Sequence, residues 1–209
     1  MITPPGVPGV VFAARADGDA RSNEHARDAL STSLGISRDW ATIRQVHGSV
    51  IVSADVPGFY GDADGLMTHS AGLPIAIATA DCVPIVLIAR DARAVVHAGW
   101  RGVAAGVVAE AIGAMDSSGN PVELAVIGPH IGPCCYEVGQ EVIDEVGGFA
   151  ATTRWGGVSL DLALAVRGQM VGIDIIDVDI CTFDDGSMAS YRQDRTSDRQ
   201  VTVAWLPTD

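Results

Sequence analysis

The sequence predicts a single α+β domain over residues 1–209, in which short strands and helices alternate irregularly. A chain of 209 residues suits one good-sized core. Three apolar runs between residues 74 and 96 are short and rich in β-branched side chains, as expected of strands buried on both faces. The sequence also contains more expected strands than a fold of regularly alternating strands and helices would need, which favours a mixed α/β or α+β architecture.

Capping residues and glycine–proline steps define most of the expected elements. Ser22 or Asn23 can cap a helix that runs to about Leu34, and Gly35 ends it. The expected strands cover residues 10–14, 41–46, 50–53, 74–78, 83–89, 94–97, 124–127, 173–180 and 201–205. Further helices are expected at 103–115, 137–146 and 160–170, the last capped by Ser159. The segments 56–65, 128–136 and 184–198 are expected to be loops.

The charge balance restricts the partners that the protein can bind. The chain has 13 Lys+Arg against 26 Asp+Glu, a net charge of −13. Nucleic acids and anionic membranes require a basic surface, so neither is an expected partner. No basic segment precedes the first apolar run, and every apolar run is too short to span a membrane. We expect a cytoplasmic protein with four reduced cysteines.

Three potential metal ligands stand at the ends of expected strands. His47 follows the strand at 41–46, Cys82 precedes the strand at 83–89, and His97 ends the next strand. A thiolate and two imidazoles suit zinc and leave a fourth position for water, whose pKa zinc lowers to about 7. A buried cysteine and a hydrogen-bonded histidine are the plainer interpretation of the Cys82–His97 pair.

Several longer motifs give these residues a context. They are Gln45-Val46-His47-Gly48, Asp62-Ala63-Asp64-Gly65, Thr79-Ala80-Asp81-Cys82-Val83-Pro84, His97-Ala98-Gly99-Trp100-Arg101-Gly102 and Ile127-Gly128-Pro129-His130-Ile131-Gly132-Pro133-Cys134-Cys135-Tyr136-Glu137-Val138-Gly139. In this order they resemble the laccase-domain family. Its members were first called multicopper polyphenol oxidases and are now regarded as zinc-dependent purine nucleoside phosphorylases with adenosine deaminase activity.

The resemblance implies a fold, a metal site and an activity. The fold would be two packed mixed sheets with helices outside, and the metal ligands would be His47, Cys82 and His97. The implied reactions are phosphorolysis of adenosine, inosine, guanosine or methylthioadenosine and deamination of adenosine by zinc-bound hydroxide. Purine nucleosides and phosphate would be the partners of a monomer or homodimer. The chain departs from the family in a shortened segment between Arg15 and Arg21.

Other residues in the motifs are candidates for catalysis and substrate binding. Deamination needs a proton carrier, which Asp81, Asp62 or Asp64 can provide; Asp81 can instead orient a ligand histidine. Arg101, at an expected helix N-terminus, is a candidate for binding phosphate. Arg44, Gln45, Asp62 and Asp64 are weaker substrate-binding candidates. A surface ion pair is the favoured interpretation of Arg44. The two loop carboxylates could bind a ribose or a cation, and a solvated acidic turn is at least as good an interpretation of them.

Three alternative functions use the same residues. Copper can bind two histidines and a cysteine, with Met67 as the methionine nearest the motifs, but five histidines are too few for a four-copper oxidase. Cys82 can be the nucleophile and His97 the base of a metal-free hydrolase. The shortened segment after Arg15 is compatible with a non-catalytic metal-binding or regulatory domain. Cys134 and Cys135 are interpreted as part of a rigid loop wall.

Overall fold

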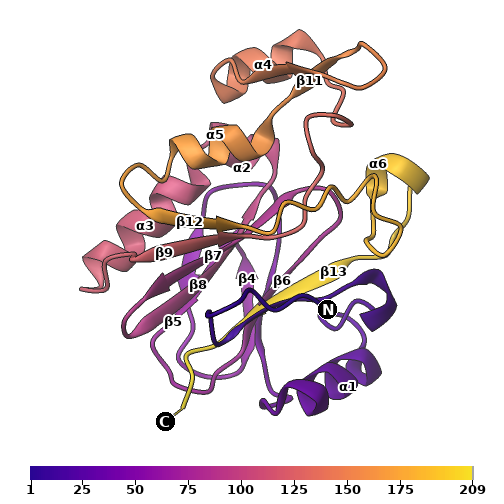
Figure 1. Cartoon of the computed structure of the whole chain (residues 1–209). Coiled ribbons are helices and arrows are strands. Elements are labelled where there is room, and N and C mark those ends of the chain that lie inside the picture. Colours follow the sequence, from indigo (N-terminus) through magenta and orange to yellow (C-terminus); the bar gives the residue numbers. More distant parts are fainter. Residues whose placement is uncertain (209) are drawn as a thin grey trace.

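Two mixed β-sheets pack face to face in the computed structural model, which describes residues 1–208 (Figure 1). One sheet has five strands in the order β1-β13-β6-β2-β4. These strands are β1 (Val10–Phe12), β13 (Gln200–Ala204), β6 (Ile75–Thr79), β2 (Ala41–Arg44) and β4 (Gly58–Asp62). The last strand of the chain therefore lies between the first strand and β6, which anchors the C-terminal segment in the sheet.

The second sheet has six strands in the order β12-β9-β7-β8-β5-β3. They are β12 (Asp174–Asp177), β9 (Leu124–Ile127), β7 (Val83–Ala89), β8 (Ala92–Ala98), β5 (Gly65–Thr68) and β3 (Ile51–Ser53). The long β7–β8 hairpin forms its centre and is buried on both faces. This confirms the interpretation of these runs as fully buried strands.

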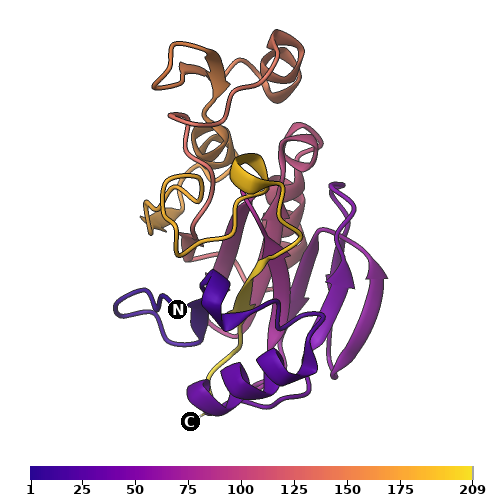
Figure 2. The same ribbon diagram turned by 90° about the vertical axis from the view of Figure 1, so that its right-hand side faces the viewer.

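Helices cover the outer face of each sheet, so the molecule has four layers. The helices are α1 (Glu24–Leu34), α2 (Trp100–Ala104), α3 (Val107–Ser117), α4 (Gln140–Val146), α5 (Leu162–Gly168) and α6 (Tyr191–Asp194). Helix α1 packs on the five-stranded sheet, whereas α2, α3 and α5 pack on the six-stranded sheet. In both views, α4 and its neighbouring hairpin lie at the opposite end of the molecule from α1 (Figures 1 and 2).

Alternating side chains of single strands explain the layering. In β7, Ile85 and Leu87 face the helices, while Val86 faces the other sheet. In β13, Val201 and Val203 face α1. Because successive strand residues point to opposite faces, a strand buried on both sides must be apolar throughout. The predicted α+β class with two mixed sheets is confirmed.

Several predicted boundaries were wrong for identifiable reasons. The expected loop 56–65 contains β4 and the start of β5, because β4 is an edge strand rich in glycine and exposed side chains. The expected helix 103–115 is divided into α2 and α3 at Gly106, which has a φ of 78°. Helix α5 is capped by Asp161, not Ser159, since residues 158–160 form strand β11 and pair with β10 (Ala150–Thr152).

Two further expectations differ in extent. The strand expected at 173–180 is shortened to β12, and the polar segment 184–198 contains the short helix α6. The cap of α1 is Asn23, one of the two predicted caps, and Gly35 ends the helix with a φ of 66°. Within residues 1–208, no helix combines the length and apolar character that crossing a bilayer requires.

Candidate metal centre and cleft

His47, Cys82 and His97 meet at one end of the two sheets. His47 follows β2 of the first sheet, Cys82 lies between β6 and β7, and His97 is the penultimate residue of β8. The two sheets thus supply one ligand each, and the connection between them supplies the third. Strand β8 is held in register at this point, since His97 lies opposite Pro84 of β7. The three predicted ligands are therefore brought together.

The spacing of the three donors suits a tetrahedral metal. Their donor atoms all lie within 4.8 Å of one another, and Cys82 Sγ is 4.0 Å from His47 Nε2. Ligand bonds of about 2.3 Å for sulfur and 2.1 Å for nitrogen place these atoms about 3.6 Å apart in a tetrahedral site. A small contraction is sufficient to close the group around one ion. The rings of His47 and His97 are nearly perpendicular, with centroids 4.7 Å apart.

Asp64 holds two of the three candidate ligands in place from a fully buried position. Its Oδ1 accepts hydrogen bonds from His97 Nδ1 at 2.7 Å and from the backbone N–H of His47 at 2.9 Å. Its Oδ2 accepts from the backbone N–H groups of Gly48 at 2.6 Å and Val46 at 3.2 Å. Because the Nδ1 proton points at the carboxylate, Nε2 of His97 is left free to bind a metal.

Backbone strain and a missing side chain also shape this centre. His47 and Asp81 both adopt positive φ angles, 62° and 90°, which are costly for residues other than glycine. A methyl group on Gly99 would lie 2.8 Å from His47 Cδ2 and 3.1 Å from Cys82 Sγ. Glycine at this position therefore leaves the space that the imidazole and the thiol occupy.

The electrostatics of the centre favour a deprotonated cysteine. Burial opposes the charge on Cys82, but His97 and His47 together lower the pKa of its thiol to about 6. Burial likewise opposes a charged His97, yet Cys82 and Asp64 raise its pKa to about 9. Burial also disfavours ionised Asp64, but His97 and the backbone N–H groups hold its pKa below the usual range. A thiolate is the form that binds a metal.

The three ligands open into a cleft of about 460 Å³ whose walls are strongly basic. Four arginines line it: Arg21, Arg101, Arg192 and Arg199. Asp81 is the only acid among the lining residues of the described chain. A protein with a net charge of −13 thus concentrates positive charge around this centre. An anionic substrate matches this field, because basic residues in a cleft raise its local concentration.

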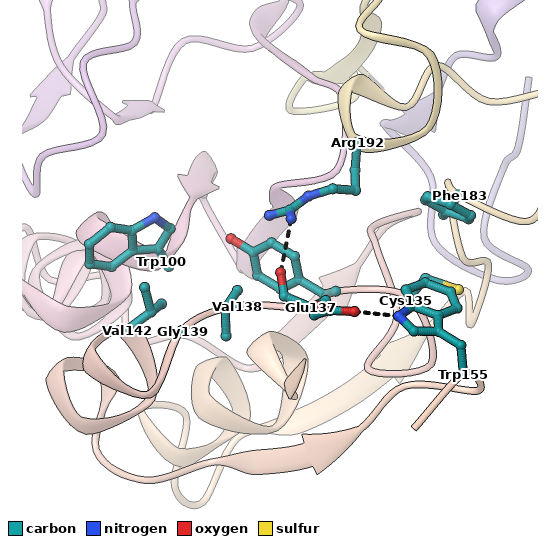
Figure 3. Close-up of a pocket in the computed structure, with 10 residues that line it drawn as sticks. Trp100, Cys135, Glu137, Val138, Gly139, Val142, Trp155, Phe183 and Arg192 are labelled. Atoms are coloured by element: carbon teal, nitrogen blue, oxygen red, sulfur yellow. Dashed lines mark hydrogen bonds between the residues drawn. The ribbon is translucent and has the colours of Figure 1, made fainter. Parts of the chain in front are cut away.

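Aromatic side chains form the remaining wall of the cleft. They are Trp100, Tyr136 and Tyr191. The Arg101 guanidinium lies over the Trp100 ring, 4.2 Å from its centroid, and Arg192 lies 5.2 Å from that of Tyr136. A second, adjoining cleft of about 760 Å³ shares Trp100, Tyr136 and Arg192 (Figure 3). There Arg192 donates a 2.9 Å hydrogen bond to the Glu137 carbonyl, drawn as a dashed line in Figure 3.

The candidate Asp81 also lines the cleft, but its carboxylate is already bonded. Oδ1 accepts a hydrogen bond from Thr182 Oγ1 at 2.8 Å, and Oδ2 accepts one from the Arg192 backbone N–H at 2.7 Å. Asp81 therefore connects the strand ends to the C-terminal segment. The carboxylate that bonds a ligand histidine is Asp64.

The other predicted binding residues divide between the cleft and the surface. Gln45 lines the cleft and pairs with Ala78 of β6 through both ends of its amide. Arg44 and Asp62 form an exposed ion pair with each other and are not among the residues that line the cleft.

Met67 pairs with Ala94 on the helix-covered face of the six-stranded sheet, whereas His97 shares the opposite face with Val95. This orientation disfavours Met67 as an axial copper ligand.

Of the four cleft arginines, Arg101 alone was predicted from the sequence. Arg21 comes from the shortened segment, in which Arg15 pairs with Asp194 and Asp198 at 2.9 Å each. Arg192 and Arg199 come from the C-terminal segment beside it. Only the contact between the two segments in space identifies these residues, although the arginine-containing polar stretch 184–198 was a signal for Arg192.

Comparison with known proteins agrees with this geometry. Residues 12–207 match the family described as multi-copper polyphenol oxidoreductase laccase. The chain belongs to the laccase-domain family. It is 34% identical over 197 residues to a purine nucleoside phosphorylase of Streptomyces coelicolor, covering 86% of this chain and 81% of that protein. It is 36% identical to a purine nucleoside phosphorylase of Xylella fastidiosa, with 88% and 78% covered.

The laccase-domain fold is also found among solved structures. YlmD from Geobacillus stearothermophilus matches with a TM-score of 0.87 and 26% identity, over 98% of this chain and 94% of that one. The likeness extends over nearly the whole chain. The resemblance inferred from the motifs is therefore confirmed.

Proposed function

We propose that this protein is a zinc-dependent purine nucleoside phosphorylase. The observation that carries the proposal is a single cleft in which three metal donors, four arginines and three aromatic side chains face one another. A nucleoside offers a flat base and phosphate offers a compact anion, so the two substrates require these two kinds of surface. The names of the relatives point to the same reaction.

Each group in the cleft has a role in this reaction. Arginines bind phosphate through charge-assisted hydrogen bonds, and Arg101 lines the same cleft as the candidate metal ligands. Trp100, Tyr136 and Tyr191 offer ring faces on which a purine can stack, worth about 1–3 kcal/mol per base. Adenosine, inosine, guanosine and methylthioadenosine all present such a base.

Tyr136 is a proposed hydrogen-bond donor to the purine. Burial and the nearby Cys82 thiolate raise the pKa of its hydroxyl to about 12. The phenol therefore keeps its proton at neutral pH, and its O–H group can donate a hydrogen bond to a purine bound in the cleft.

Zinc is the metal that two imidazoles and a thiolate suit best, and when bound it supplies a Lewis acid and an acidified water. Deamination of adenosine would in addition require a carboxylate that is free to carry a proton. Asp81 is the only carboxylate that lines the cleft in the described chain, and both of its oxygens accept hydrogen bonds. We therefore place phosphorolysis first and deamination second.

Products separate these reactions directly. Zinc-loaded protein incubated with adenosine and phosphate is expected to release adenine and ribose 1-phosphate, with inosine as a slower product. Omitting phosphate should stop adenine release and leave inosine formation unchanged. Chromatography of the two mixtures measures both. No product at high enzyme concentration would reject the nucleoside proposal and favour the non-catalytic metal-binding domain.

Arg101 provides a test of the phosphate-binding role. Arg101→Gln is expected to raise the KM for phosphate about 10- to 100-fold, because it removes a hydrogen bond to a charged group worth about 1.5–3 kcal/mol. Arg44→Gln is the matched control, since Arg44 is exposed outside the cleft. Steady-state kinetics at varied phosphate distinguishes them. An unchanged phosphate KM in Arg101→Gln contradicts the assignment.

A metal-free cysteine hydrolase is the second candidate, and one observation favours it. Cys82, His97 and Asp64 form the order of thiol, imidazole and carboxylate found in thiol enzymes, with a 2.7 Å bond between the last two. In such an enzyme the cysteine thiolate is the nucleophile, and the reaction needs no metal ion. Amide hydrolysis that survives exhaustive chelation would support this function, whereas nucleoside turnover that chelation abolishes and zinc restores would exclude it.

A further inference from the structure

A second group of metal-binding side chains lies outside the cleft centre. Cys134, Cys135, Cys181 and Asp184 place four donor atoms within 4.8 Å of one another. The first two residues belong to the loop between β9 and α4, and the other two follow β12. Three of the four cysteines of the chain therefore converge at a place that the proposed reaction does not use.

The backbone brings the two segments together. His130 and Cys181 form a parallel β-bridge, in which the His130 N–H donates to the Ile180 carbonyl at 3.1 Å and the Thr182 N–H donates to the His130 carbonyl at 2.9 Å. After the bridge, the N–H of Asp184 donates to the Cys181 carbonyl at 3.1 Å, which turns the chain back on itself. Asp184 is thereby placed beside the thiols.

Most of the donor spacings fit one tetrahedral ion. Around zinc, two sulfurs lie about 3.8 Å apart, and a sulfur and a carboxylate oxygen about 3.6 Å apart. Cys134 Sγ is 3.8 Å from Cys181 Sγ, and Asp184 Oδ2 is 3.7 Å from Cys134 Sγ and 3.5 Å from Cys135 Sγ. The adjacent pair is closer, with 2.9 Å between Cys134 Sγ and Cys135 Sγ, and must open by about 0.9 Å, a small side-chain rotation.

A backbone N–H group and an arginine lie beside these donors. The Gly132 N–H lies 3.2 Å from Cys181 Sγ, which it approaches as a donor. A methyl group on Gly132 would lie 3.3 Å from Cys134 Sγ, a tight contact, and 3.5 Å from Cys181 Sγ, so this backbone passes close to two of the sulfurs. Arg154 pairs with Oδ1 of Asp184 at 2.5 Å, which leaves Oδ2 directed at the sulfurs and offsets one negative charge.

We propose that Cys134, Cys135, Cys181 and Asp184 form a second metal site, a structural one that takes a zinc-class cation. Thiolates select soft or borderline cations such as zinc, and four protein donors close the coordination sphere. The ion would join the loop that carries Tyr136 to the segment that leads to Arg192, and both residues line the cleft. Figure 3 shows Cys135 near Trp155 and Phe183, away from Trp100.

Cobalt spectroscopy of Cys82→Ala tests this site, because that variant keeps thiols only in the second group. The reduced, metal-free variant titrated with Co²⁺ is expected to develop an intense near-ultraviolet sulfur-to-cobalt band that saturates at one ion per chain. Adding zinc should abolish the band. Absence of the band would overturn the proposal.

Zinc content gives an independent result on the folded chain. After removal of loosely bound metal, the wild-type protein should hold two zinc ions, Cys82→Ala one and Cys181→Ser one. Asp184→Asn should bind the second zinc more weakly. Asp185→Asn is the matched control, because the Asp185 carboxylate accepts a 2.7 Å hydrogen bond from Ser187 Oγ and is not one of the four proposed ligands. One zinc in wild type and none in Cys82→Ala would overturn the site, as would a disulfide involving Cys181 in freshly purified protein. Circular dichroism checks that each variant is folded.

Discussion

Replacing Cys82 by alanine is expected to abolish nucleoside turnover while leaving the protein folded. Cys82 is the only sulfur of the three donors at the cleft and lies 4.0 Å from His47 Nε2. Without it, two imidazoles remain, and the cation loses its charge-neutralising ligand. A metal contributes several kcal/mol to a reaction, and each 1.36 kcal/mol is a factor of ten, so we expect a loss of about 10³-fold or more.

The fold should survive this change for a local reason. Cys82 is a small, partly exposed residue in the connection between β6 and β7, and the apolar core begins at Val83. Metal content and kcat, measured on the same preparation with thermal unfolding, check the expectation. Cys82→Ser is the conservative companion and should lose activity to a similar extent. Turnover at the wild-type level in Cys82→Ala would reject the metal-dependent mechanism.

The parts of the fold that the sequence predicted are those whose side chains alone determine their structure. The run Val83–Ala89 is apolar at every position, and the structure places it as β7 with the predicted bounds. Strand β4, by contrast, has exposed or half-exposed residues and owes its conformation to pairing with β2. Pairing between distant segments leaves no local pattern, which is why residues 56–65 were expected to be a loop.

The site shows the same division. His47, Cys82 and His97 were predicted because each stands at a strand end within a recognisable motif. Asp64 was assigned to substrate or proton transfer, but the structure buries it completely and directs it at His97. The arginine cluster depends on Arg15 joining the N-terminal segment to Asp194 and Asp198, residues about 180 positions later. No pattern of residue spacing in the sequence predicts these long-range ion pairs.

Asp64 leads to the second large expected effect. Asp64→Asn is expected to weaken metal binding about 10- to 100-fold, since partners that orient a ligand histidine have effects of this size. The two carboxylate oxygens accept from four donors: His97 Nδ1 and the backbone N–H groups of His47, Gly48 and Val46. An asparagine offers one acceptor oxygen instead of two. Its NH₂ group would replace the other oxygen and face N–H donors, with which it cannot form hydrogen bonds.

The substitution should also destabilise the metal-free protein, by about 3–5 kcal/mol. A buried donor left without its acceptor costs about 1–3 kcal/mol, and here at least one backbone N–H and a charge-assisted bond are lost together. Thermal unfolding of the metal-free protein and competition with a chromophoric chelator measure the two effects separately.

Asp62→Asn is the matched control for Asp64→Asn, because it makes the same chemical change two residues earlier. Asp62 is exposed and, within the described residues, its carboxylate pairs with the still more exposed Arg44, so neither metal affinity nor stability should change appreciably. A difference between the two variants would therefore be caused by the burial of Asp64 and by its hydrogen-bond partners. If Asp64→Asn bound zinc as tightly as Asp62→Asn, the orientation of His97 by Asp64 would have no part in metal binding. Equal loss in both variants would instead indicate a general effect of negative charge near the cleft.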